Sequence, residues 1–284
     1  MPNTADQLAI SPEDLQIFRE QGVLLLRKAL HPEWLTLIEM GLGRVLGDPS
    51  VGKARFFQGQ AGEFQETIRN FDSAIEIKRL LFDSPIADYM AVLTGSASIW
   101  YYSDEFFIKD AGGCERTPWH QDTPYFPVAG EQLASVWITL DPLPRAECLE
   151  FIRGSHLQTM YDGFDPANPG DLSASYYEQD LPKLPDIEAN RDAWDIVAWD
   201  LEPGDLIFSS PSILHGGGPT ALNSRRRALA VRCFGEDVIY AQRPPSRPTA
   251  PFTPGLSLRL QPGEPLRSPW YPQLRPVPDS QRYG

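Results

Sequence analysis

The chain has 284 residues, with 38 Asp plus Glu against 25 Lys plus Arg, so its formal net charge is -13. Hydrophobic residues make up 42% of it, which excludes a mainly disordered chain. The acidic balance argues against a nucleic-acid binder and against general attraction to anionic membranes. Three cysteines far apart suit neither a disulfide framework nor a zinc site, and the polar, acidic start lacks a signal-peptide pattern. We therefore expect a cytoplasmic protein with reduced thiols.

The first part of the chain predicts helices around one short strand. Ser11, Pro12 and Asp14 are typical of a helix start, and this helix should run to about Gln21. The apolar run 23–26 predicts a strand, and a second helix should extend from 31 to about 46. Residues 48–72 show no clear pattern. Residues 73–94 predict further helices.

From residue 96 onward the sequence predicts strands. Aromatic and β-branched residues are concentrated in segments separated by glycine- and proline-containing turns. The expected strands are 97–109, 133–140, 148–152, 196–201, 205–209 and 226–234. Strands at this spacing favour a sandwich or jelly roll.

Two later segments depart from this pattern. Residues 157–193 form a long polar insertion, which predicts a lid or binding loop. The proline-rich stretch 241–284 holds apolar side chains that include Trp270 and Tyr271, so we expect an extended arm packed on the core. We expect one domain over 1–284, with a mostly helical part (1–95), a jelly-roll core (96–240) and this arm.

The sequence contains four histidines, and two of them point to a metal site. His120 and Asp122 are two residues apart, so on an extended strand their side chains share one face. His215 follows an apolar strand and a short turn, where a jelly roll can bring it opposite that pair. Two His and one carboxylate on one face are the ligand set of non-haem Fe(II) oxygenases.

The same residues also have an ordinary interpretation. With four histidines, about one chain in four would contain a His-x-Asp pair by chance. His31 suits a helix cap or a surface position, and His156 is left out of the predicted metal site.

The flanking sequence resembles the phytanoyl-CoA dioxygenase family of Fe(II)- and 2-oxoglutarate-dependent oxygenases. The resemblance covers most of residues 12–240. Its motifs occur in the family's order: the segment Trp119 to Pro127, Trp137 on the next strand, Glu147 to His156, the turn Pro203-Gly204-Asp205, His215 with Gly216, and Arg226. The family implies a double-stranded β-helix (jelly-roll, cupin-like) core with N-terminal and flanking helices.

The resemblance also implies roles for particular residues. His120, Asp122 and His215 would bind Fe(II), and Arg226 would hold the distal carboxylate of 2-oxoglutarate. Arg226 shares a face with two alanines, which leaves room for a small ligand, whereas Arg225 and Arg227 are the competing choices. The other predicted cofactor-binding residues are Trp137, Gln121 and Glu105. Trp137 also suits an ordinary core position, and the negative charge of Glu105 is a departure from the family.

Further departures affect the expected chemistry and substrate. Arg153 replaces the usual Pro, and Ala146-Glu147 replace Asn-Gly; substrate contact or a solvated charge pair would each explain them. Related halogenases lack the carboxylate that Asp122 supplies, so the resemblance implies hydroxylation with O2. The aromatic side chains expected near the site favour an apolar or ring-bearing metabolite: Trp100, Tyr101, Tyr102, Phe107, Trp119, Tyr125 and Phe126.

Several alternatives remain open from the sequence. The chain could be a metal-binding jelly-roll protein without turnover, or a cupin-like enzyme that does not use 2-oxoglutarate. Related oxygenases also desaturate, epimerise or cyclise their substrates. The expected partners are a small-molecule substrate, with no nucleic acid and no membrane, and the protein should be a monomer or homodimer.

Overall fold

A computed structural model describes residue 8 and residues 10–56, 63–109, 112–165, 181–242 and 259–278. The helices are α1 (Pro12–Gln21), α2 (Pro32–Gly47), α3 (Asn70–Ser73), α4 (Ile75–Asp83) and α5 (Ile86–Thr94). The strands are β1 (Val23–Leu26), β2 (Lys53–Phe56), β3 (Phe64–Ile68), β4 (Ile99–Lys109), β5 (Thr117–His120), β6 (Val128–Ala129), β7 (Leu133–Thr139), β8 (Leu149–Ile152), β9 (Ile196–Val197), β10 (Leu206–Ser209), β11 (His215–Gly217), β12 (Arg226–Phe234), β13 (Ile239–Tyr240) and β14 (Gln273–Arg275). None of these helices combines the length and apolar character needed to span a membrane.

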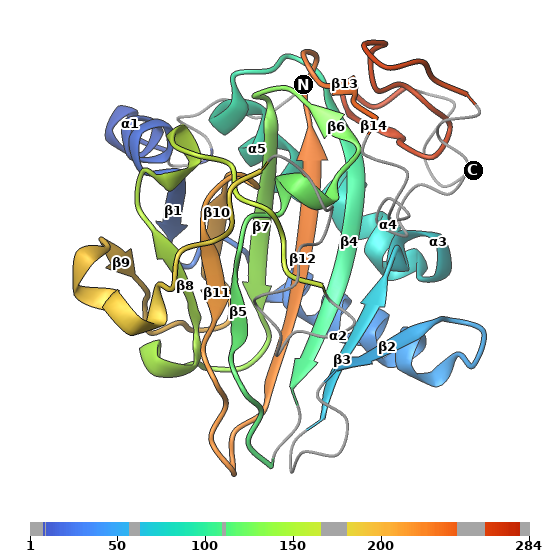
Figure 1. The fold of residues 1–284 in the computed structure, drawn as a ribbon. Coiled ribbons are helices and arrows are strands. Elements are labelled where there is room, and N and C mark those ends of the chain that lie inside the picture. Colours follow the sequence, from blue (N-terminus) through green and yellow to red (C-terminus); the bar gives the residue numbers. More distant parts are fainter. Residues whose placement is uncertain are drawn as a thin grey trace.

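Two antiparallel sheets form the centre of the molecule. The larger has the order β1-β10-β7-β12-β4-β3-β2, with β14 paired to β4, and the smaller has the order β5-β11-β8-β9. In Figure 1, β12 runs through the middle of the larger sheet between β7 and β4. Phe151 of the smaller sheet packs in one cluster with Trp137 and Ala228 of the larger, so the two sheets face each other. This arrangement is a jelly roll.

Strand β12 shows how the alternating pattern builds the two layers. Leu229, Val231 and Cys233 point to the outer side, where they pack in one core cluster with residues of the helices. Ala228 and Ala230 point to the inner side and pack with residues of the facing sheet. Alternate residues of this strand therefore face the two sides of the sheet, as its period of two in the sequence predicts.

Most predicted elements are confirmed, and three differences have physical causes. The predicted strand 196–201 is shorter, because β9 pairs only with two residues of β8 at the sheet edge. The unpatterned residues 48–72 contain β2 and β3, which extend the larger sheet, as well as most of α3. The part expected to be mostly helical thus supplies three strands of this sheet: β2 and β3, and also β1, which pairs with β10.

The two irregular segments are described in part. Residues 166–180 of the insertion and 243–258 and 279–284 of the arm lie outside the described residues. Within the arm, Leu266 and Tyr271 are buried in a cluster with Tyr102 and Phe234, and β14 pairs with β4. Within the insertion, the ring of Phe164 lies edge-on to His120, with centroids 5.3 Å apart. The insertion therefore reaches the predicted metal site.

Candidate active site

Three metal-ligating side chains converge between strands β5 and β11. His120 ends β5, His215 begins β11, and the two residues are direct partners in the antiparallel ladder. Asp122 follows His120 by two residues. Its Oδ1 lies 3.5 Å from Nε2 of His120 and 3.9 Å from Nε2 of His215. One ligand atom from each of the three lies within 4.8 Å of the others.

Backbone carbonyls orient both imidazole rings. Nδ1 of His120 lies 2.8 Å from the carbonyl oxygen of Pro118, and Nδ1 of His215 lies 3.1 Å from that of Ile213. A carbonyl only accepts, so each Nδ1 carries a proton and donates it. Each Nε2 then has a free lone pair directed toward Asp122, as a metal ligand requires.

The electrostatics also favour metal binding. Burial and the nearby His120 together lower the pKa of His215 to about 4, so its imidazole is neutral near pH 7. Burial by itself would raise the pKa of Asp122, but Arg232 and the two histidines hold it well below its usual range. The site therefore offers one ionised carboxylate and at least one neutral imidazole.

Arg232 fixes the carboxylate of Asp122. Its Nε and Nη2 each lie 3.0 Å from Oδ2 of Asp122, and its Nη1 lies 2.9 Å from Oε2 of Glu105. All three side chains are nearly buried. Because Oδ2 is occupied in this way, Oδ1 is the oxygen that faces the two imidazoles.

The triad opens on a cavity of about 110 Å³ between the two sheets. One wall is apolar and aromatic and includes Phe64, Phe107, Trp137 and Phe151. Arg226 also lines this cavity. A small cavity that combines a ligand triad, an aromatic wall and a buried cation is suited to a small anionic ligand beside a metal.

Arg226 is the buried cation among the three consecutive arginines. Its Nη1 donates to the carbonyl oxygens of Glu147 and Gly218, and no described carboxylate forms an ion pair with it. Burial lowers its pKa to about 10. Arg227 pairs with Asp141 and Glu39, and the half-exposed Arg225 lies 3.6 Å from Asp141, so both belong to the surface.

A second cation lies next to Arg226. Lys109 is its direct partner in the β4–β12 ladder and is fully buried, with Nζ 2.6 Å from the carbonyl oxygen of Glu115. Burial, with repulsion from Arg226, lowers its pKa to about 7. This end of the barrel therefore holds two cations, and an anion would offset their repulsion.

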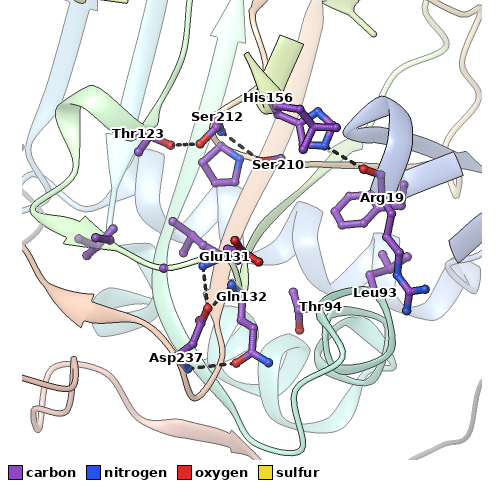
Figure 2. A pocket seen from close by; sticks show the side chains of 17 residues that line it. Arg19, Leu93, Thr94, Thr123, Glu131, Gln132, His156, Ser210, Ser212 and Asp237 are labelled. Carbon is purple, nitrogen blue, oxygen red and sulfur yellow. Dashed lines mark hydrogen bonds between the residues drawn. The ribbon is translucent and has the colours of Figure 1, made fainter. Parts of the chain in front are cut away.

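A larger cavity of about 540 Å³ lies elsewhere, beside α1, α5 and β6. Figure 2 shows that its polar groups are engaged with one another: Asp237 accepts from the backbone amides of Glu131 and Gln132, and Thr123 and Ser212 share a hydrogen bond. It holds no described group of three metal ligands. The larger cavity is therefore not the candidate site.

The comparison with protein families identifies the chain. The family model described as phytanoyl-CoA dioxygenase (PhyH) matches residues 18–228, a span that contains the triad and Arg226. The chain belongs to the phytanoyl-CoA dioxygenase family. The predicted family is thereby confirmed.

Individual relatives of the family are distant. The human peroxisomal phytanoyl-CoA dioxygenase is 23% identical over 232 residues, which is 80% of this chain and 63% of the human protein. This chain thus spans less than two thirds of that relative's length.

Solved structures share the fold. The non-heme alpha ketoglutarate dependent carbocyclase SnoK from nogalamycin biosynthesis has a TM-score of 0.71 at 23% identity, covering 96% of this chain and 99% of its own. The epimerase SnoN, in complex with Fe3+, alpha ketoglutarate and nogalamycin RO, has a TM-score of 0.69 at 19% identity, covering 93% and 98%. These likenesses confirm the predicted mainly β, jelly-roll architecture.

The structure separates the predicted site residues of this family member into two groups. His120, Asp122, His215, Arg226 and Trp137 all line the same cavity. Gln121 and Glu105 are not among the lining residues. The amide of Gln121 bonds to the backbone of Thr159, Tyr161 and Ser212, and Glu105 is occupied with Arg232.

Other sequence expectations have mixed outcomes. His31 caps α2, and His156 bonds to the backbone of Arg19, away from the triad. Arg153 forms an exposed ion pair with Asp195, as expected for a solvated charge pair. The backbone carbonyl of Glu147 instead accepts a hydrogen bond from Arg226. Of the aromatic residues expected around the pocket only Phe107 lines it, and the others pack in hydrophobic clusters: Trp100, Tyr101, Tyr102, Trp119, Tyr125 and Phe126.

Two charged residues near the site were not predicted. Arg232 was detectable, because it continues the inward-facing series of Arg226, Ala228 and Ala230 at a period of two. Glu66 gave no signal, because its segment shows no alternation of apolar and polar residues.

Proposed function

We propose that the protein is an Fe(II)- and 2-oxoglutarate-dependent dioxygenase that hydroxylates a C–H bond of a small organic metabolite. Succinate and CO2 would be released with the hydroxylated product. One observation carries this proposal: the His120–Asp122–His215 triad and the unpaired guanidinium of Arg226 face one small cavity. A metal site alone would not need a buried guanidinium in the same cavity.

The three ligand atoms fit an Fe(II) ion. Ligands that share an octahedral ion lie about 3 Å apart, since each bond is about 2.1 Å long. The carboxylate–imidazole distances of 3.5 and 3.9 Å require only a small inward movement. Two imidazoles and one carboxylate on one face leave further coordination positions open, as in non-haem Fe(II) oxygenases.

The cations at the end of the cavity fit 2-oxoglutarate. Arg226 would bind its distal carboxylate, and Lys109 would add positive charge from the neighbouring strand. Trp137 and Ala230 line the space between this end and the triad. The small side chain of Ala230 leaves room for a five-carbon acid there.

The metal and cosubstrate, when bound, supply the oxidising chemistry with O2. The chain's own residues supply orientation and protection. Arg232 holds Asp122, carbonyls hold the two imidazoles, and the aromatic wall excludes water from the reacting C–H bond.

A second outcome of the same chemistry is favoured by the structural neighbours. SnoK is named a carbocyclase and SnoN an epimerase. If this chain acted as they do, the product would lose two hydrogens or keep the substrate's mass, whereas hydroxylation adds one oxygen atom. Mass spectrometry of the product therefore separates the outcomes once a substrate is found.

The first experiment needs no substrate. Metal-free protein receives Fe(II) and then 2-oxoglutarate without oxygen, and the visible spectrum is recorded. We expect a weak charge-transfer band that requires both additions. A library can then be screened for succinate release.

The other results would favour the alternatives. Iron binding without the band would favour a cupin-like enzyme that does not use 2-oxoglutarate. Absence of iron binding would favour a jelly-roll binding protein without turnover.

A further inference from the structure

Glu66 places a carboxylate on the inner face of the larger sheet, next to the active-site cavity. It lies in the middle of β3, directly opposite Phe107 of β4. Phe64 precedes it by two residues, so both side chains share one face of the strand. Phe64 and Phe107 both line the cavity. In Figure 1, β3 lies beside β4, between it and the edge strand β2.

This carboxylate has no partner of its own. Within the described residues, no hydrogen bond or ion pair reaches Glu66. The cation that acts on it electrostatically is Arg232, which is already bound to Glu105 and Asp122. Three carboxylates therefore share one guanidinium, which leaves two negative charges in excess when all three are ionised.

The environment makes this excess charge costly. Burial, together with repulsion from Glu105 and Asp122, raises the pKa of Glu66 to about 8 against the opposing effect of Arg232. An Fe(II) ion at the triad would be bound by Asp122, and 2-oxoglutarate would be matched by Arg226 and Lys109. Neither of them would form a direct ion pair with Glu66.

Glu66 does not itself line the cavity, but it stands beside two residues that do and keeps some exposure. Its neighbour on β2 is Ala54, a small and exposed residue, and Glu66 itself is only partly buried. On the other side, the rings of Phe64 and Phe107 lie 6.1 Å apart. A carboxylate beside aromatic faces is the combination that recognises an organic ammonium group, by charge pairing and by cation–π attraction.

We propose that Glu66 is a substrate-binding residue and that the substrate of this site carries a positively charged amino group, which pairs with Glu66. This inference rests on the proposed function, because it treats the cavity as a substrate site. The apolar part of such a substrate would lie against Phe64 and Phe107, and its reacting C–H bond would face the triad.

The test compares three probes of similar shape and different charge: phenethylamine, phenethyl alcohol and hydrocinnamate. Binding to the protein loaded anaerobically with Fe(II) and 2-oxoglutarate is measured by calorimetry at about pH 8.5, where the amine stays protonated and Glu66 is largely ionised. We expect the amine to bind at least about tenfold more tightly than the alcohol, because a charge-assisted hydrogen bond replaces a neutral one.

Variants assign the effect to one side chain. Glu66→Gln should lower the amine affinity to that of the alcohol, and Glu66→Lys should shift the preference to hydrocinnamate. Glu63→Gln is the matched control: it removes an equal charge three residues away, where Glu63 pairs with Arg55. It should leave all three affinities unchanged. Thermal unfolding of each variant checks that it is folded.

The inference is overturned if the amine has no advantage, if none of the probes binds, or if Glu66→Gln keeps the preference. The charge-transfer band is recorded in the same samples. A band without amine preference refutes the role of Glu66 and leaves the proposed function intact. Amine preference is also measured in metal-free protein, so a missing band refutes the proposed function separately.

Discussion

Arg232 binds one carboxylate oxygen of Asp122 and leaves the other for the two histidines. Nε and Nη2 of Arg232 both lie 3.0 Å from Oδ2, whereas Oδ1 lies 3.5 Å from His120 and 3.9 Å from His215. A buried carboxylate with one oxygen fixed cannot rotate freely. The strand β12 thus positions a ligand that follows β5, across the space between the two sheets.

We expect Arg232→Met to weaken Fe(II) binding by about 10- to 100-fold, because loss of a residue that orients a ligand typically has this effect. The same change leaves Glu105 and Asp122 as unpaired buried carboxylates, which should cost about 3–5 kcal/mol of unfolding free energy. Anaerobic Fe(II) titration and chemical denaturation measure the two effects.

The double variant Arg232→Met with Glu105→Gln separates metal binding from stability. It should recover part of the unfolding free energy but keep the weak Fe(II) binding, since Asp122 is still not oriented. Arg153→Met, which removes an exposed pair with Asp195, serves as the control. The positive charge of Arg232 by itself opposes a metal cation, so a gain in Fe(II) affinity on its removal would contradict a positioning role.

Arg226→Ala should weaken 2-oxoglutarate binding while Fe(II) binding is retained. Truncating one member of a buried charge pair costs about 2–5 kcal/mol, roughly a 30-fold loss or more. Arg226→Lys should recover only part of the affinity, because an ammonium cannot form two parallel bonds to a carboxylate. Calorimetry with 2-oxoglutarate measures this, and Arg225→Ala, half-exposed beside Asp141, is the control. Unchanged cosubstrate affinity in Arg226→Ala would exclude the assignment.

The sequence allowed prediction of the residues that follow a short period. His120 and Asp122 are two apart, and Arg226 alternates with alanines, so extended strands place each set on one face. The pairing of β5 with β11, which brings His215 opposite His120, follows from long-range topology. The sequence predicted that part of the site only through the expected jelly-roll topology, and the family resemblance then assigned its role.

Residues 48–72 show why the rest could not be predicted. Glu66 stands in β3 between the apolar Phe64 and Ile68, so its strand lacks a clean polar–apolar alternation. The inner face of β3 borders the cavity, where the charged Glu66 stands beside aromatic side chains. The partners of Arg232 were likewise hidden, because Glu105 and Asp122 lie in segments far from it in sequence.

His120→Ala, Asp122→Ala and His215→Ala should each abolish stoichiometric Fe(II) binding, since removal of one of three ligands leaves an incomplete site. The iron content after anaerobic loading and gel filtration measures this. His156→Ala is the control, because this histidine bonds to the backbone of Arg19 and belongs to no described ligand cluster. Full occupancy in any one of the three variants would remove that residue from the triad.

Lys109 should make cosubstrate binding and stability depend on pH in opposite directions. Its pKa is lowered to about 7 from 10.5 by burial and by Arg226. Between these two values the unfolded chain binds the proton more strongly than the folded chain does, so the free energy of unfolding rises with pH across this window. Below about pH 7 the buried ammonium is charged, and its destabilising effect on the folded state is greatest there.

The charged ammonium is the form that attracts 2-oxoglutarate, so the affinity for this dianion should fall as the pH rises above about 7. Lys109→Met should bind 2-oxoglutarate more weakly at low pH and should lose both pH dependences. Calorimetry and denaturation between about pH 6 and pH 9 measure them, with Lys53→Met, whose ammonium bonds to the carbonyl of Leu46 at the surface, as the control. If Lys109→Met kept the fall in affinity, another group would be responsible, and the two cations at the end of the cavity would not act together.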